Sequence, residues 1–186
     1  DAHSLGVLGP NGDGTGAHFG IQDEVDLIAG TFSKSLASVG GFVAGTERVI
    51  NYLRHHSRTF IFTAALPPAN TAGVLAALEV LQSEPERRER VWHNARRLQD
   101  GLRGLGYDIG ETVTPIVPVL IGPLDKTMIM WRQMYDAGVF TNPVVPPAVP
   151  HSQCRLRTSV MATHTDDQID FCLDAFGRIG KALGVI

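Results

Sequence analysis

Residues 31–42 read Thr-Phe-Ser-Lys-Ser-Leu-Ala-Ser-Val-Gly-Gly-Phe, with one lysine among hydroxyl residues and a glycine pair behind it. The apolar run before it, residues 25–29, is short and bounded by turn formers, which predicts a buried strand. Burying an ammonium group is costly unless its charge is paired or its pKa falls, so a lysine directly after a buried strand is unusual. The neutral amine of such a lysine can attack a carbonyl, and the hydroxyls of Thr31, Ser33 and Ser35 can donate to a phosphate. On composition alone, the interpretation of Lys34 as a surface lysine in a Ser/Gly loop is the favoured one.

A second notable stretch lies at the start of the chain, where residues 3–16 are rich in glycine. Such a stretch predicts a loop whose backbone takes positive φ angles or closely approaches another group. The glycines do not form a G-x-G-x-x-G pattern after a strand, so a dinucleotide site is not expected.

The bulk properties narrow the class of protein. The chain has 186 residues, is 44% hydrophobic and carries a net charge of −3, as a globular protein with one or two cores does. No apolar run is long enough for a transmembrane span, and no signal peptide is visible, so we expect a cytoplasmic protein. The mixed, mildly acidic charge argues against a nucleic-acid partner. Cys154 and Cys172 form neither a disulfide framework nor a metal-ligand spacing, and His55-His56 is interpreted as a solvated helix end.

Hydrophobic periodicity and turn signals predict the secondary structure, and the pattern changes near Ser83. We interpret Ser83 as the N-cap of a long helix. Thr165 is expected to cap the last helix. Beyond residue 105 the predicted order is strand, helix, strand, strand, helix. The predicted helices are residues 47–56, 70–82, 84–105, 125–137 and 165–183, and the predicted strands are residues 23–30, 40–45, 60–63, 116–121, 138–141 and 154–160.

Two motifs together indicate a family. Residues 1–14, Asp-Ala-His-Ser-Leu-Gly-Val-Leu-Gly-Pro-Asn-Gly-Asp-Gly, followed by Thr-Phe-Ser-Lys at residues 31–34, resemble the α-oxoamine synthases, which depend on pyridoxal 5′-phosphate (PLP) and have the type I, aspartate-aminotransferase fold. The resemblance runs along the whole chain and implies an α/β fold. Residues 1–83 would be the C-terminal part of the PLP-binding large domain with its mostly parallel sheet, and residues 84–186 a smaller α+β C-terminal domain.

The resemblance also assigns roles to individual residues. Lys34 would hold PLP covalently, and His3 matches the family histidine that lies at the cofactor ring near its phenolic oxygen. Thr31 matches a phosphate-contacting threonine, with Ser33 as a second phosphate ligand. Thr63, in a Thr-Ala-Ala-Leu-Pro-Pro string, would reach the cofactor phosphate of the neighbouring subunit, which implies a homodimer with shared active sites. The alternative is that Thr63 caps the helix that follows.

The acid that bonds the pyridine nitrogen in this family is expected outside the chain. Asp1 aligns with the second acid of the family's Asp-(Glu or Asp)-Ala-His string, so the first acid would directly precede it. Family chains are longer than this one, and the resemblance places the chain in their C-terminal half. We therefore expect the 186 residues alone to be inactive.

Arg157 is the candidate substrate residue. A guanidinium binds a carboxylate in a two-pronged fork, and the family arginine in this Leu-Arg-x-Ser/Thr string holds the carboxylate of the amino acid. The alternative is a surface arginine in a salt bridge of little energetic weight. A departure from the family lies at Val145, which stands where some members have the arginine of Arg-Pro-Pro-x-x-Pro, and this leaves a second carboxylate contact in doubt.

The resemblance implies condensation of an amino acid with an acyl-CoA thioester, with loss of CoA and CO2, to give an α-amino ketone. Residues 30–35, 40–42, 62–64 and 184–186 are most similar to the serine palmitoyltransferase branch, which suggests L-serine, a long-chain acyl-CoA and sphingolipid biosynthesis. Three alternatives remain open. One is another α-oxoamine synthase that uses glycine or alanine, similar to 8-amino-7-oxononanoate synthase or 2-amino-3-ketobutyrate CoA ligase. The others are a PLP aminotransferase and a non-catalytic partner subunit, and Lys34 argues against the last.

Overall fold

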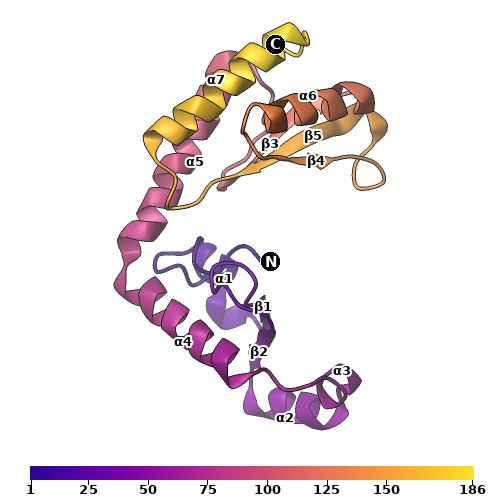
Figure 1. Cartoon of the computed structure of the whole chain (residues 1–186). Coiled ribbons are helices and arrows are strands. Elements are labelled where there is room, and N and C mark those ends of the chain that lie inside the picture. Colours follow the sequence, from indigo (N-terminus) through magenta and orange to yellow (C-terminus); the bar gives the residue numbers. More distant parts are fainter. The chain divides into compact units, whose positions relative to one another are not determined.

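A computed structural model describes residues 1–186, and contacts between α-carbons divide the chain into two compact units, residues 1–88 and 89–186. The elements of both units are labelled in Figure 1. The division falls within helix α5 (Pro85–Leu105), slightly after the boundary that the sequence suggests between residues 83 and 84. None of the helices combines the length and the apolar character that a bilayer crossing requires.

The first unit is built around a short hairpin of β1 (Leu27–Thr31) and β2 (Gly41–Gly45). The two strands pair antiparallel, with Leu27 opposite Gly45 and Thr31 opposite Gly41. The remaining elements are α1 (Thr15–His18), η1 (Gln22–Glu24), α2 (Glu47–His56), α3 (Arg58–Ile61) and α4 (Pro68–Ser83). All strand pairs within residues 1–186 are antiparallel, so the mostly parallel sheet expected of the large domain has no parallel pair in this chain.

The expectation of a buried strand at residues 25–29 is wrong for this chain. Leu27 and Ile28 are 44% and 37% exposed, so the faces of the two-stranded sheet are not covered at these positions. Leu36 is the only large apolar side chain of the first unit that is fully buried, at 3% exposure. Most large apolar side chains of this unit are therefore exposed.

Two local predictions in the first unit are also wrong. Residues 58–61 form the short helix α3 instead of a strand, because Ser57 Oγ accepts a hydrogen bond from Phe60 N at 3.4 Å and so caps a helical turn. Ser83 is not an N-cap but the last residue of α4, and its hydroxyl donates to the Glu79 carbonyl at 2.8 Å. Helix α5 instead begins at Pro85, whose fixed φ and missing N–H suit the first position of a helix.

The second unit is a three-stranded sheet covered by helices. Strands β3 (Ile116–Gly122), β5 (Cys154–Ser159) and β4 (Asn142–Val144) lie in that order, with every pair antiparallel. Helices α5, α6 (Leu124–Asp136) and α7 (Asp166–Ala182) complete the unit together with η2 (His151–Gln153). Figure 1 shows α7 alongside α5 and α6 over the sheet. The core forms where alternate strand residues meet these helices, and its fully buried members include Val117, Val119, Met130, Met134, Leu156 and Phe176.

The predicted order of elements in this unit is correct, but one strand lies elsewhere. Residues 138–141 are not a strand, because Gly138 has a φ of +86° and follows the C-terminus of α6. Thr141 is buried, and its carbonyl accepts a hydrogen bond from Trp131 Nε1 at 3.1 Å instead of joining the sheet. Strand β4 begins one residue later, at Asn142.

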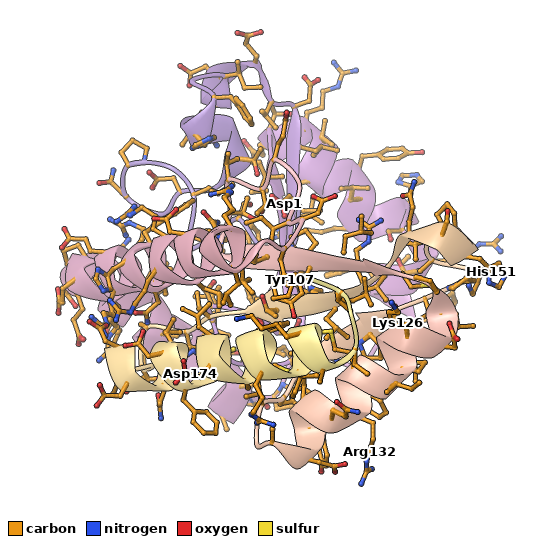
Figure 2. All side chains as sticks on the ribbon, turned by 90° about the horizontal axis from the view of Figure 1, so that it is seen from above. Asp1, Tyr107, Lys126, Arg132, His151 and Asp174 are labelled. Carbon is orange, nitrogen blue, oxygen red and sulfur yellow. The ribbon has the colours of Figure 1, made fainter.

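Gly180 of α7 is a site where we predict a large loss of stability. The Tyr107 hydroxyl donates to the Phe176 carbonyl at 2.8 Å, and Figure 2 shows Tyr107 beside this helix. A Cβ built on Gly180 would collide with that hydroxyl group. Replacing Gly180 with alanine should lower the free energy of unfolding by about 1–3 kcal/mol, the usual cost of overpacking. Denaturant titration measures this, with Gly104→Ala in α5 as control, because a Cβ there meets nothing and should not destabilise. An equal effect of both changes would contradict the steric argument.

Ion pairs join α5 to α7. Arg97 binds Asp170 through two hydrogen bonds of 2.9 and 2.7 Å, and Arg90 binds Asp166 at 2.5 Å. Asp166 also lies 3.3 Å from His93 Nε2. The predicted cap of α7 is confirmed: Thr165 Oγ1 accepts from Gln168 N, and Gln168 Oε1 accepts from Thr165 N.

The hydrogen bond from Arg90 lowers the pKa of Asp166 below its ordinary value of 3.8. A carboxylate with a lowered pKa stabilises the folded state above its unfolded pKa, and this contribution is lost as the pH falls through the folded value. Below about pH 4, the free energy of unfolding of the wild type should therefore fall as Asp166 becomes protonated. Asp166→Asn should lack this part of the fall. Urea unfolding as a function of pH measures this. Asp174→Asn on the same helix, which has no ion-pair partner, should leave the acid limb as in the wild type.

Candidate functional site

Lys34 lies in a tight loop directly after β1. The loop is closed by two backbone hydrogen bonds, from Ala37 N to the Lys34 carbonyl at 3.0 Å and from Ser38 N to the Phe32 carbonyl at 2.9 Å. Leu36 points inward and is buried, whereas Lys34 is exposed. The Lys34 side chain is therefore accessible to a ligand.

Two hydroxyl groups belong to residues shortly before the lysine in the chain, Thr31 and Ser33. Thr31 Oγ1 lies 2.9 Å from Ser33 Oγ, and it also accepts from Ser33 N at 3.3 Å. Thr31 Oγ1 can also donate to the Gly40 carbonyl, at the longer distance of 3.3 Å. The Ser33 hydroxyl and the Lys34 ammonium are donors that suit an anionic group. Ser35 is different, because its hydroxyl donates to the Leu5 carbonyl at 2.7 Å. Its expected role as a phosphate donor is therefore not supported.

The hydrogen bond from Ser35 joins the loop between β1 and β2, residues 32–40, here called the lysine loop, to the glycine-rich loop that carries His3. That loop closes on itself through hydrogen bonds from Gly6 N to the Gly12 carbonyl at 2.8 Å and from Gly14 N to the Leu8 carbonyl at 2.9 Å. Gly6 has a φ of +82°, and a Cβ on it would lie 2.8 Å from Ser35 Cβ. The structure therefore requires glycine at this contact.

The Asp1 carboxylate holds the backbone around His3. One of its oxygens accepts from His3 N at 3.0 Å, and the other accepts from Thr15 Oγ1 at 2.9 Å. The structure thus joins the segments of His3, Thr31, Ser33 and Lys34 within one unit.

Thr63 lies between α3 and α4 and is exposed. Its hydroxyl donates back to the Thr59 carbonyl, and the N-cap of α4 is Pro67, so the alternative that Thr63 caps the following helix is wrong. Three residues further on, the Leu66 side chain packs against the lysine loop, since a Cβ on Gly40 would lie 2.9 Å from a Leu66 methyl group. The segment after Thr63 is therefore in contact with the segment of Lys34.

Arg157 belongs to the second unit, on the central strand β5. It lies on the sheet face opposite the core, with Pro118 of β3 and Asn142 of β4 as its register partners. It is half-buried, and its guanidinium forms no hydrogen bond or ion pair with the protein, whereas Arg90, Arg97 and Arg132 each bind a carboxylate. The alternative of a surface salt bridge is therefore wrong, and the guanidinium fork of Arg157 is available for a ligand.

Two polar residues in these units were not identified from the sequence. Asn70 of α4 binds Ser38 of the lysine loop, and Asn94 of α5 donates to the carbonyls of Met161 and His164 at 2.9 and 3.0 Å, in the turn that follows β5. No motif marks either residue. The sequence shows only an asparagine on a predicted helix, and this does not indicate which group its side chain binds.

The site geometry can be compared with known proteins. The family model of aminotransferase class I and II matches residues 1–176. The chain belongs to this family. The predicted α/β, aspartate-aminotransferase-like fold is thereby confirmed.

Among curated members of the family, similar relatives carry two names. The chain is 51% identical over 181 residues to a serine palmitoyltransferase of Sphingobacterium spiritivorum, with 97% of this chain and 45% of that protein aligned. It is 46% identical over 186 residues to a serine palmitoyltransferase of Bacteroides ovatus, and 41% identical over 186 residues to an 8-amino-7-oxononanoate synthase of Petrotoga mobilis, each alignment covering 100% of this chain and 47% of the relative. The resemblance to both groups is confirmed. The chain spans about half the length of the curated relatives it matches.

Solved structures agree with this assignment. A serine palmitoyltransferase structure described as containing a PLP internal aldimine matches with a TM-score of 0.95 and 39% identity, covering 100% of this chain and 47% of that one. The serine palmitoyltransferase of Sphingomonas wittichii matches with a TM-score of 0.95 and 36% identity over the same shares.

Proposed function

We propose that this member of the aminotransferase class I and II family belongs to a PLP-dependent acyltransferase that condenses L-serine with a long-chain acyl-CoA. The observation that carries the proposal is the exposed Lys34 directly after the paired hydroxyls of Thr31 and Ser33, in a chain 51% identical to a serine palmitoyltransferase. The products would be an α-amino ketone, CO2 and free CoA, as expected for a step of sphingolipid biosynthesis.

The residues of the first unit fit PLP. Lys34 supplies an accessible amine, and Thr31 and Ser33 supply hydroxyl donors for a phosphate beside it. His3, on the loop fastened by Ser35, would lie at the cofactor ring. When bound, PLP acts as an electron sink that stabilises negative charge at the α-carbon of an amino acid.

Two residues have proposed tasks toward the amino acid. Arg157 would hold the amino-acid carboxylate in its free guanidinium fork, which fixes the orientation of the bonds at the α-carbon. The Lys34 amine would accept the proton from the α-carbon as general base. The α-carbon then forms a bond to the acyl carbonyl carbon while the carbon–sulfur bond of the thioester breaks, and CoA leaves as the thiol with the proton that Lys34 accepted. The substrate carboxylate finally departs as CO2, and a proton from solvent takes its place at the α-carbon.

We also propose a homodimer in which Thr63 reaches the cofactor phosphate of the neighbouring subunit. Thr63 is exposed, and the preceding apolar residues Phe60, Ile61 and Phe62 are 63%, 51% and 84% exposed. Consecutive exposed apolar side chains of this size are typical of a protein interface. The mass of the full-length protein measured by light scattering tests the dimer.

A cytoplasmic location is part of the proposal. Both cysteines are free thiols, as is usual in a reducing compartment. Burial raises the pKa of the Cys172 thiol to about 12, which keeps it protonated and unreactive at neutral pH.

The decisive assay supplies the full-length protein with PLP, an acyl-CoA and one amino acid at a time. We expect release of CO2 and CoA thiol with L-serine and palmitoyl-CoA, and much less with glycine or L-alanine. Preference for alanine with a different acyl-CoA would favour the second candidate, an 8-amino-7-oxononanoate synthase, to which the chain is 41% identical in Petrotoga mobilis. Amino-group transfer without consumption of acyl-CoA would contradict both.

A further inference from the structure

The loop that carries Lys34 contains a backbone conformation that needs support. Ala37 has a φ of +49°, in the left-handed region that residues other than glycine rarely adopt. Such a conformation persists where the surrounding structure holds it in place. Because Ala37 N donates to the Lys34 carbonyl at 3.0 Å, whatever holds Ala37 also fixes the backbone of the lysine.

Ser38, the next residue, is held by a side chain 32 residues further along the chain. Asn70 Nδ2 donates to Ser38 Oγ at 3.2 Å, and Ser38 Oγ donates in return to the Asn70 carbonyl at 3.4 Å. Both residues are partly buried, and Asn70 lies in the first turn of the 16-residue helix α4, a rigid element. The Leu66 contact with Gly40 lies beside this pair and packs the same segment against the loop.

Ser35 and Ser38 thus anchor the loop on both sides of Leu36. On one side Ser35 donates to the Leu5 carbonyl at 2.7 Å, and on the other Ser38 pairs with Asn70. Lys34 is exposed, and hydrogen bonds hold Ser35 and Ser38, which follow it in the chain. The Thr31 and Ser33 hydroxyls belong to the cofactor site proposed above, whereas Asn70 lies outside it.

We propose that Asn70 is a positioning residue that holds the Lys34 amine in its working place through Ser38. The proposal rests on the proposed function of Lys34 as the residue that holds PLP and accepts the proton from the α-carbon. A proton transfer depends steeply on the distance and direction of the base, so a looser loop should lower the rate of the chemical step. Substrate binding does not depend on Asn70, because its side chain is bound to Ser38.

The test combines hydrogen exchange with kinetics in the full-length protein. In Asn70→Ala we expect the amides of Ala37 and Ser38 to exchange about tenfold faster in the cofactor-free protein, as loss of a side-chain hydrogen bond predicts. We expect kcat to fall by about the same factor, with KM for the amino acid unchanged. The matched control is Thr71→Val on the same helix turn, because the Thr71 hydroxyl binds only the Pro67 carbonyl. It should leave both readouts as in the wild type.

A double-mutant cycle with Ser38→Ala separates positioning from general stability. Ser38→Ala removes both bonds, whereas Asn70→Ala keeps the backbone carbonyl of residue 70, so if the two side chains act as a pair the double variant should be no worse than Ser38→Ala alone. Additive effects, unchanged exchange at residues 37–38, or faster exchange with an unchanged kcat would each overturn the proposal, as would a uniform rise in exchange across the first unit. If the wild-type protein shows no turnover with any amino acid, the proposed function fails, and local exchange in the cofactor-free protein alone decides whether Asn70 anchors the lysine loop.

Discussion

Replacing Lys34 with alanine should lower kcat of the full-length protein by about 10⁴-fold or more, because one substitution removes both the amine that would hold PLP and the proposed general base. Lys34 is exposed, so its loss leaves no cavity, and the free energy of unfolding should remain close to that of the wild type. Steady-state rates with L-serine and palmitoyl-CoA, together with denaturant unfolding, measure the two effects.

The matched control for this change is Lys181→Ala in the last turn of α7. Lys181 is also exposed and has the same charge, so this variant should retain the wild-type rate. A Lys34→Ala protein that keeps a substantial rate would contradict the role of the lysine as the residue that holds PLP and as the general base.

The second large effect is expected at Arg157. Replacing it with alanine should raise KM for the amino acid by about 10–100-fold, since a charge-assisted hydrogen bond contributes about 1.5–3 kcal/mol. The affinity for acyl-CoA should change little. Arg157→Lys should restore only part of the loss, because an ammonium cannot form the planar fork.

Arg155 is the matched control for Arg157, since it is an arginine on the same strand and the same face of the sheet. Its guanidinium is already engaged, with hydrogen bonds to the Gln153 carbonyl at 3.0 Å and to Gln153 Oε1 at 3.2 Å. Arg155→Ala should therefore leave KM for the amino acid unchanged. Equal effects of the two changes would show that the face attracts anions only by its general charge.

The helices could be predicted from the sequence because their signals are local. The stripe on α4, the first-turn proline of α5 and the Thr165–Gln168 capping box each depend on residues within a few positions of one another. Prediction failed where distant contacts decide. Residues 60–63 have the β-branched and aromatic character of a strand, yet residues 58–61 form a helix, because a strand needs a neighbouring strand and none lies beside them.

The candidate site shows the same limit. Lys34, Thr31, Ser33, His3 and Arg157 lie in recognisable strings, so the sequence was enough to nominate them. The contacts that hold them were not predictable. The bond from Ser35 to Leu5 spans 30 residues and the pairing of Ser38 with Asn70 spans 32, and neither leaves a trace in local composition.

The most direct measurement is borohydride reduction of the full-length protein loaded with PLP, followed by digestion and peptide mass spectrometry. The predicted result is one pyridoxyl group on Lys34, with Lys126 and Lys181 unmodified. Retention of an unmodified Lys34 under conditions that trap PLP on another lysine, or on none, would contradict the proposed role of this loop as the cofactor site.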